Sequence, residues 1–370
     1  MQLKDEHLDQ AENAYNQKTI DKKKSLENKN SHMILGTFDL QQCLPTPMLR
    51  TSVSFYKRPL WTNNLTVRNS TLKVTSCFMW HQAFAERGTC EIGSCLNRFI
   101  SDLPQHIKHV ILYSDSCGGQ NKSNFIAAMF MCVVQNHPNI KIIDHKFLIP
   151  GHTHMECDSD HSVIERAKKK SASMIVIPEH WYELVKNASE SFKVFEMKQH
   201  HFMDFKAILK GPLVLRKKNI NGEALVWHDV RWFRYLRDSN GTFLYKYSLN
   251  EADEFKKADF LRKKGNSVIY QRELKPKYDK PVSISKEKKQ DLIDMLPLID
   301  PKLHDFYLKL NSSALVKCVD PDVEIIESVI AESKKSQIIE EDESLVENEA
   351  SVNNRSNKAK RSARKKKSHV

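Results

Sequence analysis

A short apolar run that ends in a polar turn narrows the choice of folds for this chain. Residues 109–115 read His-Val-Ile-Leu-Tyr-Ser-Asp, and the turn at 116–121 contains two adjacent glycines. A run of this length is typical of a buried strand, and glycines beside polar residues mark a turn. An apolar helical stretch follows at 124–134. Buried strands that alternate with helices indicate an α/β fold.

The rest of residues 32–204 continues this alternation. We expect further strands at 33–40, 52–56, 65–67, 72–80 and 140–149. We expect further helices at 91–103 and 155–170. Strands first, followed by two strand–helix units, is the order of an RNase H-like α/β domain, in which helices flank a mixed sheet.

The segments on either side of residues 32–204 differ from them in composition and pattern. Residues 1–31 are polar and free of proline and glycine, which predicts a helix. In the segment 205–319, Asn-Gly pairs at 221–222 and 240–241 signal hairpin turns, so we expect a small antiparallel sheet there. A helix at 286–310 is expected to follow this sheet.

Aromatic and basic residues are interleaved in the segment 205–319. The aromatic ones are Trp227, Trp232, Phe233, Tyr235, Phe243, Tyr245 and Tyr247. The basic ones are Arg231, Arg234, Arg237 and Lys246. We favour the interpretation that the aromatics form the core of the sheet. In the alternative, they stack on unpaired bases while Arg231 and Arg234 bind nucleic acid.

The formal net charge of +12 is unevenly distributed along the chain. Residues 320–349 hold eleven acidic and two basic residues, and residues 350–370 hold eight basic and no acidic ones. Neither part has aromatics, so we expect residues 320–370 to form a disordered tail, first acidic and then basic. Residues 1–319 are basic as well, which favours DNA as a partner over a merely solvated lysine-rich surface. RNA is the alternative partner, and a homo-oligomer is left open.

The sequence argues against a membrane protein and against a secreted one. No apolar run approaches the roughly 20 residues that span a bilayer, and the first residues lack the apolar core of a signal peptide. The eight cysteines contain no C-x-x-C pair, which suits free thiols in a reducing compartment. A metal site of Cys90 and Cys95 with His152 and His154 is a minor alternative.

Three acids occupy positions at which the predicted topology suits phosphodiester chemistry. Asp39 lies inside the first strand, Asp115 ends the central strand, and Asp158 opens the helix at 155–170. Cleavage by metal ions needs carboxylates from separate chain segments that converge on Mg²⁺ or Mn²⁺. We therefore expect Asp39, Asp115 and Asp158 to be catalytic residues and metal ligands.

Each of these acids also has a structural interpretation. Asp39 faces water in that case, Asp115 caps the turn that follows it, and Asp158 stabilises a helix N-terminus. The third ligand is the least defined, because residues 151–161 hold three acids and three histidines. Glu165 is an additional candidate, since it shares a helix face with Asp158 and His161, and either His161 or His154 could ligate a metal ion or donate to a phosphate.

Several of these stretches together resemble a known family. The residues that carry the resemblance are Phe38–Gln41, Arg87–Leu96, Asp115–Lys122 and Gly151–Asp158. They resemble a transposon-derived family of largely uncharacterised animal proteins with an RNase H-like, DDE/DDD transposase-like core. The resemblance covers most of residues 1–310 and implies a nuclease domain centred on residues 32–172. It implies candidate acids at Asp39, Asp115 and Asp158.

The resulting hypothesis is a DNA nuclease or transposase that uses Mg²⁺ or Mn²⁺. Under it, we expect the nucleic-acid ligands to be Gln120, Asn121, Lys122, His152, His154, Arg231 and Arg234. The alternative is a domesticated DNA-binding or chromatin protein without catalysis. A protein-interaction scaffold that uses the acidic residues 320–349 is a third and weaker reading.

A basic cluster near the end of the chain indicates a nuclear protein. Its members are Lys358, Lys360, Arg361, Arg364, Lys365, Lys366 and Lys367. Such a run reads as a nuclear localisation signal or a nucleic-acid-binding arm, and both place the protein in the nucleus.

Overall fold

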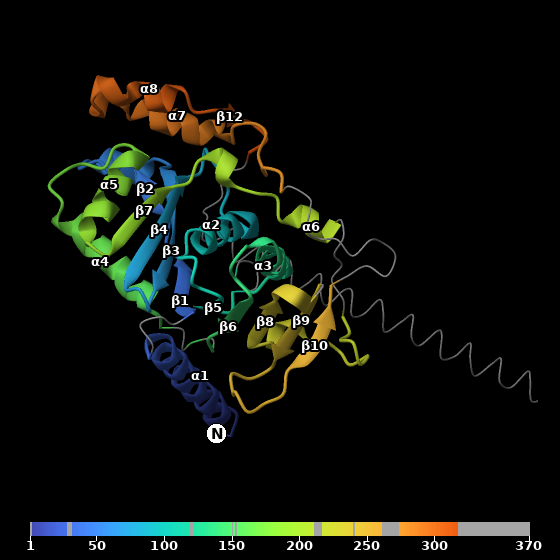
Figure 1. Cartoon of the computed structure of the whole chain (residues 1–370). Coiled ribbons are helices and arrows are strands. Elements are labelled where there is room, and N and C mark those ends of the chain that lie inside the picture. Colours follow the sequence, from blue (N-terminus) through green and yellow to red (C-terminus); the bar gives the residue numbers. More distant parts are fainter. Residues whose placement is uncertain are drawn as a thin grey trace, which may run out of the picture. The chain divides into compact units, whose positions relative to one another are not determined.

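The computed structural model is built around one large mixed sheet (Figure 1). The structure describes residues 2–27, 32–117, 121–149, 151, 154–210, 217–239, 241–260 and 274–316, without the side chains of residues 2–6 and 210. In this part of the chain the sheet has ten strands in the order β10-β9-β8-β6-β5-β1-β3-β4-β7, with β2 paired to β3.

The strands are β1 (Met33–Leu40), β2 (Leu44–Thr46), β3 (Leu60–Asn69), β4 (Val74–His81), β5 (His109–Ser114), β6 (Ile142–Phe147), β7 (Phe192–Glu196), β8 (Trp232–Leu236), β9 (Thr242–Lys246) and β10 (Lys256–Asp259). A separate short pair consists of β11 (Ile284–Ser285) and β12 (Ser312–Ser313). The helices are α1 (Gln2–Leu26), α2 (Thr89–Ser101), α3 (Asn124–Asn136), α4 (Glu156–Lys170), α5 (Pro178–Ala188), α6 (Lys206–Lys210), α7 (Lys286–Asp294) and α8 (His304–Leu308).

At the centre of the sheet, the elements follow one another along the chain in the expected order, with three strands before two strand–helix units. β1, β3 and β4 form an antiparallel meander, while β5 pairs in parallel with β1 and β6 pairs in parallel with β5. Helix α3 follows β5, and α4 follows β6. The predicted class, a mixed α/β sheet flanked by helices with a β-rich segment and C-terminal helices, is therefore confirmed.

Helices cover both faces of the sheet, with α4 and α5 on one face and α2 and α3 on the other (Figure 1). The alternation of side chains in β1 follows from this arrangement. Phe38 belongs to the hydrophobic cluster that includes α2 and α3. Thr37 points the other way and touches Cys157 of α4, with 3.3 Å between the hydroxyl and the thiol. Asp39, two residues on, shares the face of Thr37 and so points toward α4.

Helix α1 lies on the same face as α4 and docks through polar contacts. Ala11 and Ala14 are its buried apolar residues among those described. Asp21 is buried and forms an ion pair with Lys146 of β6 at 2.6 Å. The Tyr113 hydroxyl of β5 donates to the same carboxylate at 2.6 Å. Asp21 and Lys146 are both buried, so loss of either one would leave the charge of the other without a partner in the protein interior.

Three predictions about individual elements were wrong. Residues 52–56 form a short 3-10 helix, because the edge of β3 next to them already pairs with β2. The expected helix at 286–310 is divided into α7 and α8, since Pro297 and Pro301 lack the amide hydrogen that a continuous helix needs. The hairpin strands β8 and β9 do not form a sheet of their own, because β8 pairs with β6 and extends the main sheet.

The aromatic residues of this extension form a core, as favoured above. Trp232, Phe233, Tyr235, Phe243 and Tyr245 are all buried. Their rings contact one another and the surrounding side chains, so they are not placed to stack on bases.

Among the described residues, no helix is both long enough and apolar enough to cross a membrane. The predicted tail at 320–370 lies outside the described residues. The predicted nuclear localisation residues belong to that tail, so they remain a prediction from the sequence.

Candidate metal centre

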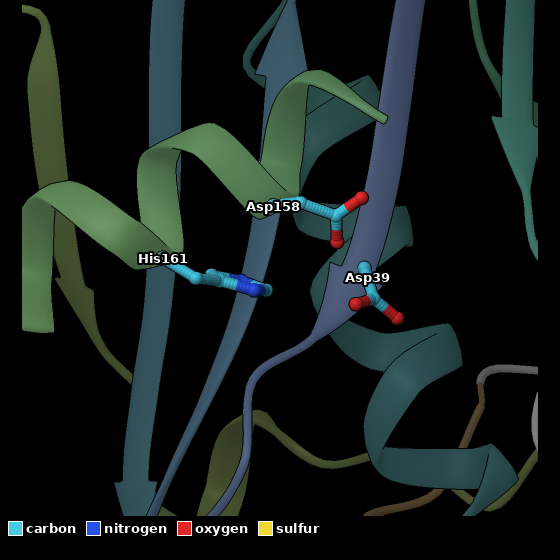
Figure 2. A group of neighbouring side chains, drawn as sticks. All are labelled: Asp39, Asp158 and His161. Carbon is cyan, nitrogen blue, oxygen red and sulfur yellow. The ribbon is translucent and has the colours of Figure 1, made fainter. Parts of the chain in front are cut away.

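Three side chains from two elements converge on the face of the sheet that α4 covers. Asp39 comes from the end of β1, and Asp158 and His161 come from the first turns of α4 (Figure 2). One ligand atom from each of the three lies within 4.8 Å of the others. Two carboxylates and an imidazole at this spacing are a donor set that suits a divalent cation.

The carboxyl group of Asp39 is in an environment that disfavours its charge. Burial raises its pKa to about 7, and the nearby carboxylates of Asp115 and Asp158 raise it as well. The Arg87 guanidinium lowers this pKa, but by less. Excess negative charge of this kind is what a bound cation would neutralise, so the electrostatics fit a metal site.

Asp158 is held in place by the start of its own helix. Its Oδ2 accepts a hydrogen bond from the backbone N–H of Met155 at 2.7 Å, which caps the first turn of α4. The His154 ring lies 3.4 Å from the same oxygen. Among the described residues, Oδ1 has no hydrogen-bond partner. The predicted capping role and a role as ligand are therefore compatible.

His161 lies one turn further along α4 and is a neutral imidazole. Burial lowers its pKa to about 4. Its Nε2 lies 3.0 Å from the hydroxyl of Thr66, which faces Asp39 across the β1–β3 pair. This contact fixes the orientation of the ring beside Asp39 and Asp158. A hydrogen bond to the second ring nitrogen is how proteins usually orient a histidine ligand.

Asp115 lies outside the group defined by the 4.8 Å spacing, although its charge reaches Asp39. Its Oδ1 accepts hydrogen bonds from the side-chain amide of Asn121 at 2.6 Å and from the backbone N–H of Cys117 at 3.2 Å. Asn121 is buried and thus orients Asp115. The predicted turn-capping role of Asp115 is confirmed, and its charge acts on Asp39 from outside the converging group.

Glu165 is not among the three side chains that converge, contrary to the expectation from helix periodicity. It lies on the same helix as His161, but it is outside the converging group. Its carboxylate is instead 3.6 Å from the ammonium group of Lys168, one turn further on. His161, which the sequence offered as an alternative ligand, lies in the converging group.

Two of the residues predicted to bind nucleic acid, Lys122 and Arg234, make contacts inside the fold instead. The Lys122 amine donates to the backbone carbonyl of His228 and lies 4.9 Å from the Phe147 ring centre. Burial and the nearby Arg231 lower the pKa of Lys122 to about 7. Arg234 makes a two-pronged ion pair with the buried Asp144, at 2.7 and 2.8 Å. Both side chains therefore have structural roles.

The remaining predicted nucleic-acid ligands stay near the site or lie outside the description. The Arg231 guanidinium is 3.4 Å from the Ser116 hydroxyl, beside Asp115. His154 has an exposed side chain next to Asp158. Gln120 and His152 lie outside the described residues.

Sequence reasoning did not identify Arg87 as part of the site. Its guanidinium donates to the backbone carbonyl of Gln41, two residues after Asp39, at 3.0 Å. Arg87 opens one of the stretches that carry the family resemblance, but its contact with Gln41 could not be read from that stretch, because it joins segments 46 residues apart.

Residues 66–247 match a family model described as a domain of unknown function, DUF7869. The matched region contains Asp115, Asp158 and His161, while Asp39 precedes it. No curated protein and no solved structure matches the chain.

Proposed function

We propose that this protein is a transposon-derived, metal-dependent nuclease that cleaves DNA phosphodiester bonds. The observation that carries the proposal is the convergence of Asp39, Asp158 and His161 within 4.8 Å, from two elements that are more than 100 residues apart in the chain. Carboxylates that meet from separate segments on one face of a sheet are what metal-assisted cleavage needs.

Each residue of the centre has a distinct task in this proposal. Asp39 and Asp158 supply the oxygen ligands for Mg²⁺ or Mn²⁺, and His161 supplies a nitrogen ligand. The metal ion, when bound, activates water and polarises the phosphate. Asp115, held by Asn121, contributes negative charge beside Asp39, which would favour a bound cation. Arg231, next to Ser116, is placed to contact a phosphate.

The test is cleavage of labelled duplex and single-stranded DNA in Mn²⁺ or in EDTA. Wild-type protein is expected to cut only with the metal ion, and Asp39→Asn and Asp158→Asn are expected to abolish cutting. Glu165→Gln is the matched control on the same helix and should retain it. Metal-independent cutting, or cutting that survives in both Asp variants, would refute the proposal.

A second candidate function is a catalytically inactive DNA-binding or chromatin-associated protein. The hydrogen bonds within the site favour it, because Asp158 caps its own helix and Asp115 accepts two bonds from its own loop. Under this alternative, duplex binding that weakens with salt remains while metal-dependent cleavage is absent.

The nucleus is the proposed compartment for either function. The basic cluster Lys358–Lys367 supports it, as a short run of lysine and arginine is the usual form of an import signal. Fusion of residues 350–370 to a fluorescent protein should move that protein into the nucleus, and a fusion that stays in the cytoplasm would contradict this assignment.

A further inference from the structure

Two adjacent aromatic side chains are almost completely exposed at one end of the sheet. Phe55 is 85% exposed and Tyr56 is 82% exposed, the highest values among the aromatic residues that the structure describes. They belong to the 3-10 helix Ser52–Tyr56, and their ring centres are 5.3 Å apart at an interplanar angle of 87°. Side chains of this size normally bury most of their apolar area, so their exposure indicates a binding surface.

The segment that carries these rings is anchored on one side to α7. Lys57 forms ion pairs with Asp294 at 2.6 Å and with Asp291 at 3.2 Å. Arg58 pairs with Asp291 at 2.6 Å. Inside the turn, the Ser54 hydroxyl donates to the carbonyl of Thr51 at 2.9 Å. These ion pairs and this hydrogen bond fix the turn that carries the two rings.

Positive charge lies on the segment that precedes the rings and on the end of α4, which runs beside that segment. The Arg50 guanidinium donates to the carbonyl of Ala172 at 2.7 Å, directly after the end of α4. Met48 also bridges to Ile175, so the two segments run side by side. The last turn of α4 contains Lys168, Lys169 and Lys170, of which the last two are exposed. Arg50 is exposed as well, so this surface complements an anionic ligand.

The same two elements connect this surface with the candidate metal centre. Asp39 faces Thr66 of β3, and β3 begins six residues earlier at Leu60, shortly after Tyr56. Six residues of strand span roughly 20 Å. Helix α4 has Asp158 in its first turn and Lys170 at its end, which separates them by roughly 18 Å at the usual helical rise.

We propose that Phe55 and Tyr56, with Arg50, Lys169 and Lys170, bind an unpaired nucleic-acid strand. The rings offer faces on which bases stack, and the cations contact the phosphates beside them. The inference rests on the proposed nuclease function, in which this strand is a single-stranded extension of the DNA held at the metal centre.

The first test measures binding in EDTA, where cleavage does not interfere. Fluorescence anisotropy with labelled 20-nucleotide oligo-dT or oligo-U gives the affinity of the full chain. The double variant Phe55→Ala/Tyr56→Ala is expected to bind roughly tenfold or more weakly. Phe55→Leu/Tyr56→Leu keeps an apolar surface without a ring and is expected to lose as much. Leu72→Ala, at the other end of β3 and also exposed, is the matched control and should bind as wild type does.

The second test follows the cations through salt dependence. Lys169→Gln/Lys170→Gln should flatten the slope of log affinity against log salt by about 1.4, since each phosphate contact to a single strand contributes about 0.7. A slope equal to that of the wild type would overturn the role of these lysines.

Other outcomes identify other occupants and overturn the proposal. If the double alanine variant binds the oligonucleotide as tightly as the wild type, the two rings do not bind the strand. If the leucine variant binds as tightly as the wild type, the contact is a general apolar one and does not involve stacking. A wild-type dimer in sedimentation that the alanine variant dissociates assigns the rings to a second copy of the chain. Strand binding that requires the rings, in a protein that never cleaves, supports this surface and refutes the nuclease proposal separately.

Discussion

Replacing Asp39 by asparagine is expected to stabilise the metal-free protein, with an effect that grows as the pH rises. The pKa of Asp39 is raised from 3.8 to about 7 in the folded state. Between these two values the folded state binds more protons than the unfolded state, so the acid lowers the free energy of unfolding as the pH rises. Asparagine has a similar shape and no charge, and it removes this cost.

The size of the effect follows from the pKa difference. About three pH units at about 1.4 kcal/mol each give an upper limit of about 4 kcal/mol. Asp39 is partly exposed, so solvent screening reduces the value, and we expect about 2–3 kcal/mol at pH 8. At pH 4 the gain should nearly vanish, because the carboxyl group is then protonated in the folded protein.

Urea unfolding in EDTA between pH 4 and pH 8 measures this difference. Glu165→Gln is the control and should give a profile parallel to that of the wild type. Saturating Mn²⁺ should raise the stability of the wild type and not that of Asp39→Asn, because only the wild type keeps the full ligand set. A variant that is less stable than the wild type at pH 8 in EDTA would refute the electrostatic reasoning.

Two further predictions concern buried charges away from the centre. Asp21→Ala leaves Lys146 buried without its carboxylate partner, and it should lower the free energy of unfolding in urea by about 3 kcal/mol. Asp9→Asn, at an exposed position of α1, is the control and should change this free energy little. Equal effects of the two substitutions would contradict the pairing of Asp21 with Lys146. Burial lowers the pKa of His81 and His161 to about 4, so the unfolded state binds protons first and the free energy of unfolding should fall as the pH drops from 6.5 to 4. The profile is measured in Asp39→Asn, because the titration of Asp39 acts in the opposite direction over the same range, and a flat profile in that variant would contradict neutral buried rings.

The strands and helices that position the centre were predictable, because each has a strong local pattern. The apolar run before Asp115 predicted β5, and the polar residue inside an apolar strand marked Asp39. Periodicity also predicted α4 with Asp158 near its start. All three signals come from neighbouring residues, which the sequence displays directly.

The choice among residues on one helix face was not predictable. Periodicity places His161 and Glu165 on the same side of α4, but contacts with other segments separate them. His161 contacts Thr66 of β3, whereas Glu165 pairs with Lys168 on its own helix. Lys122 was misjudged for the same reason, since its partner His228 is 106 residues away.

The exposed aromatics were also hidden from sequence reasoning. Residues 52–55 alternate polar and apolar side chains as a strand would, and the aromatics at 227–247 are the denser cluster. Only the pairing of β2 with β3, and of β8 with β6, shows which set is buried and which faces solvent.

Binding of Mn²⁺, followed by electron paramagnetic resonance of the free ion, tests the central claim most directly. The wild type and Glu165→Gln are expected to bind at least one ion per chain at pH 7.5. Asp39→Asn and Asp158→Asn should lose that ion, and His161→Ala should bind it more weakly. A wild type that binds no Mn²⁺, or Asp39 and Asp158 variants that bind it as tightly as the wild type, would contradict a metal centre at this position.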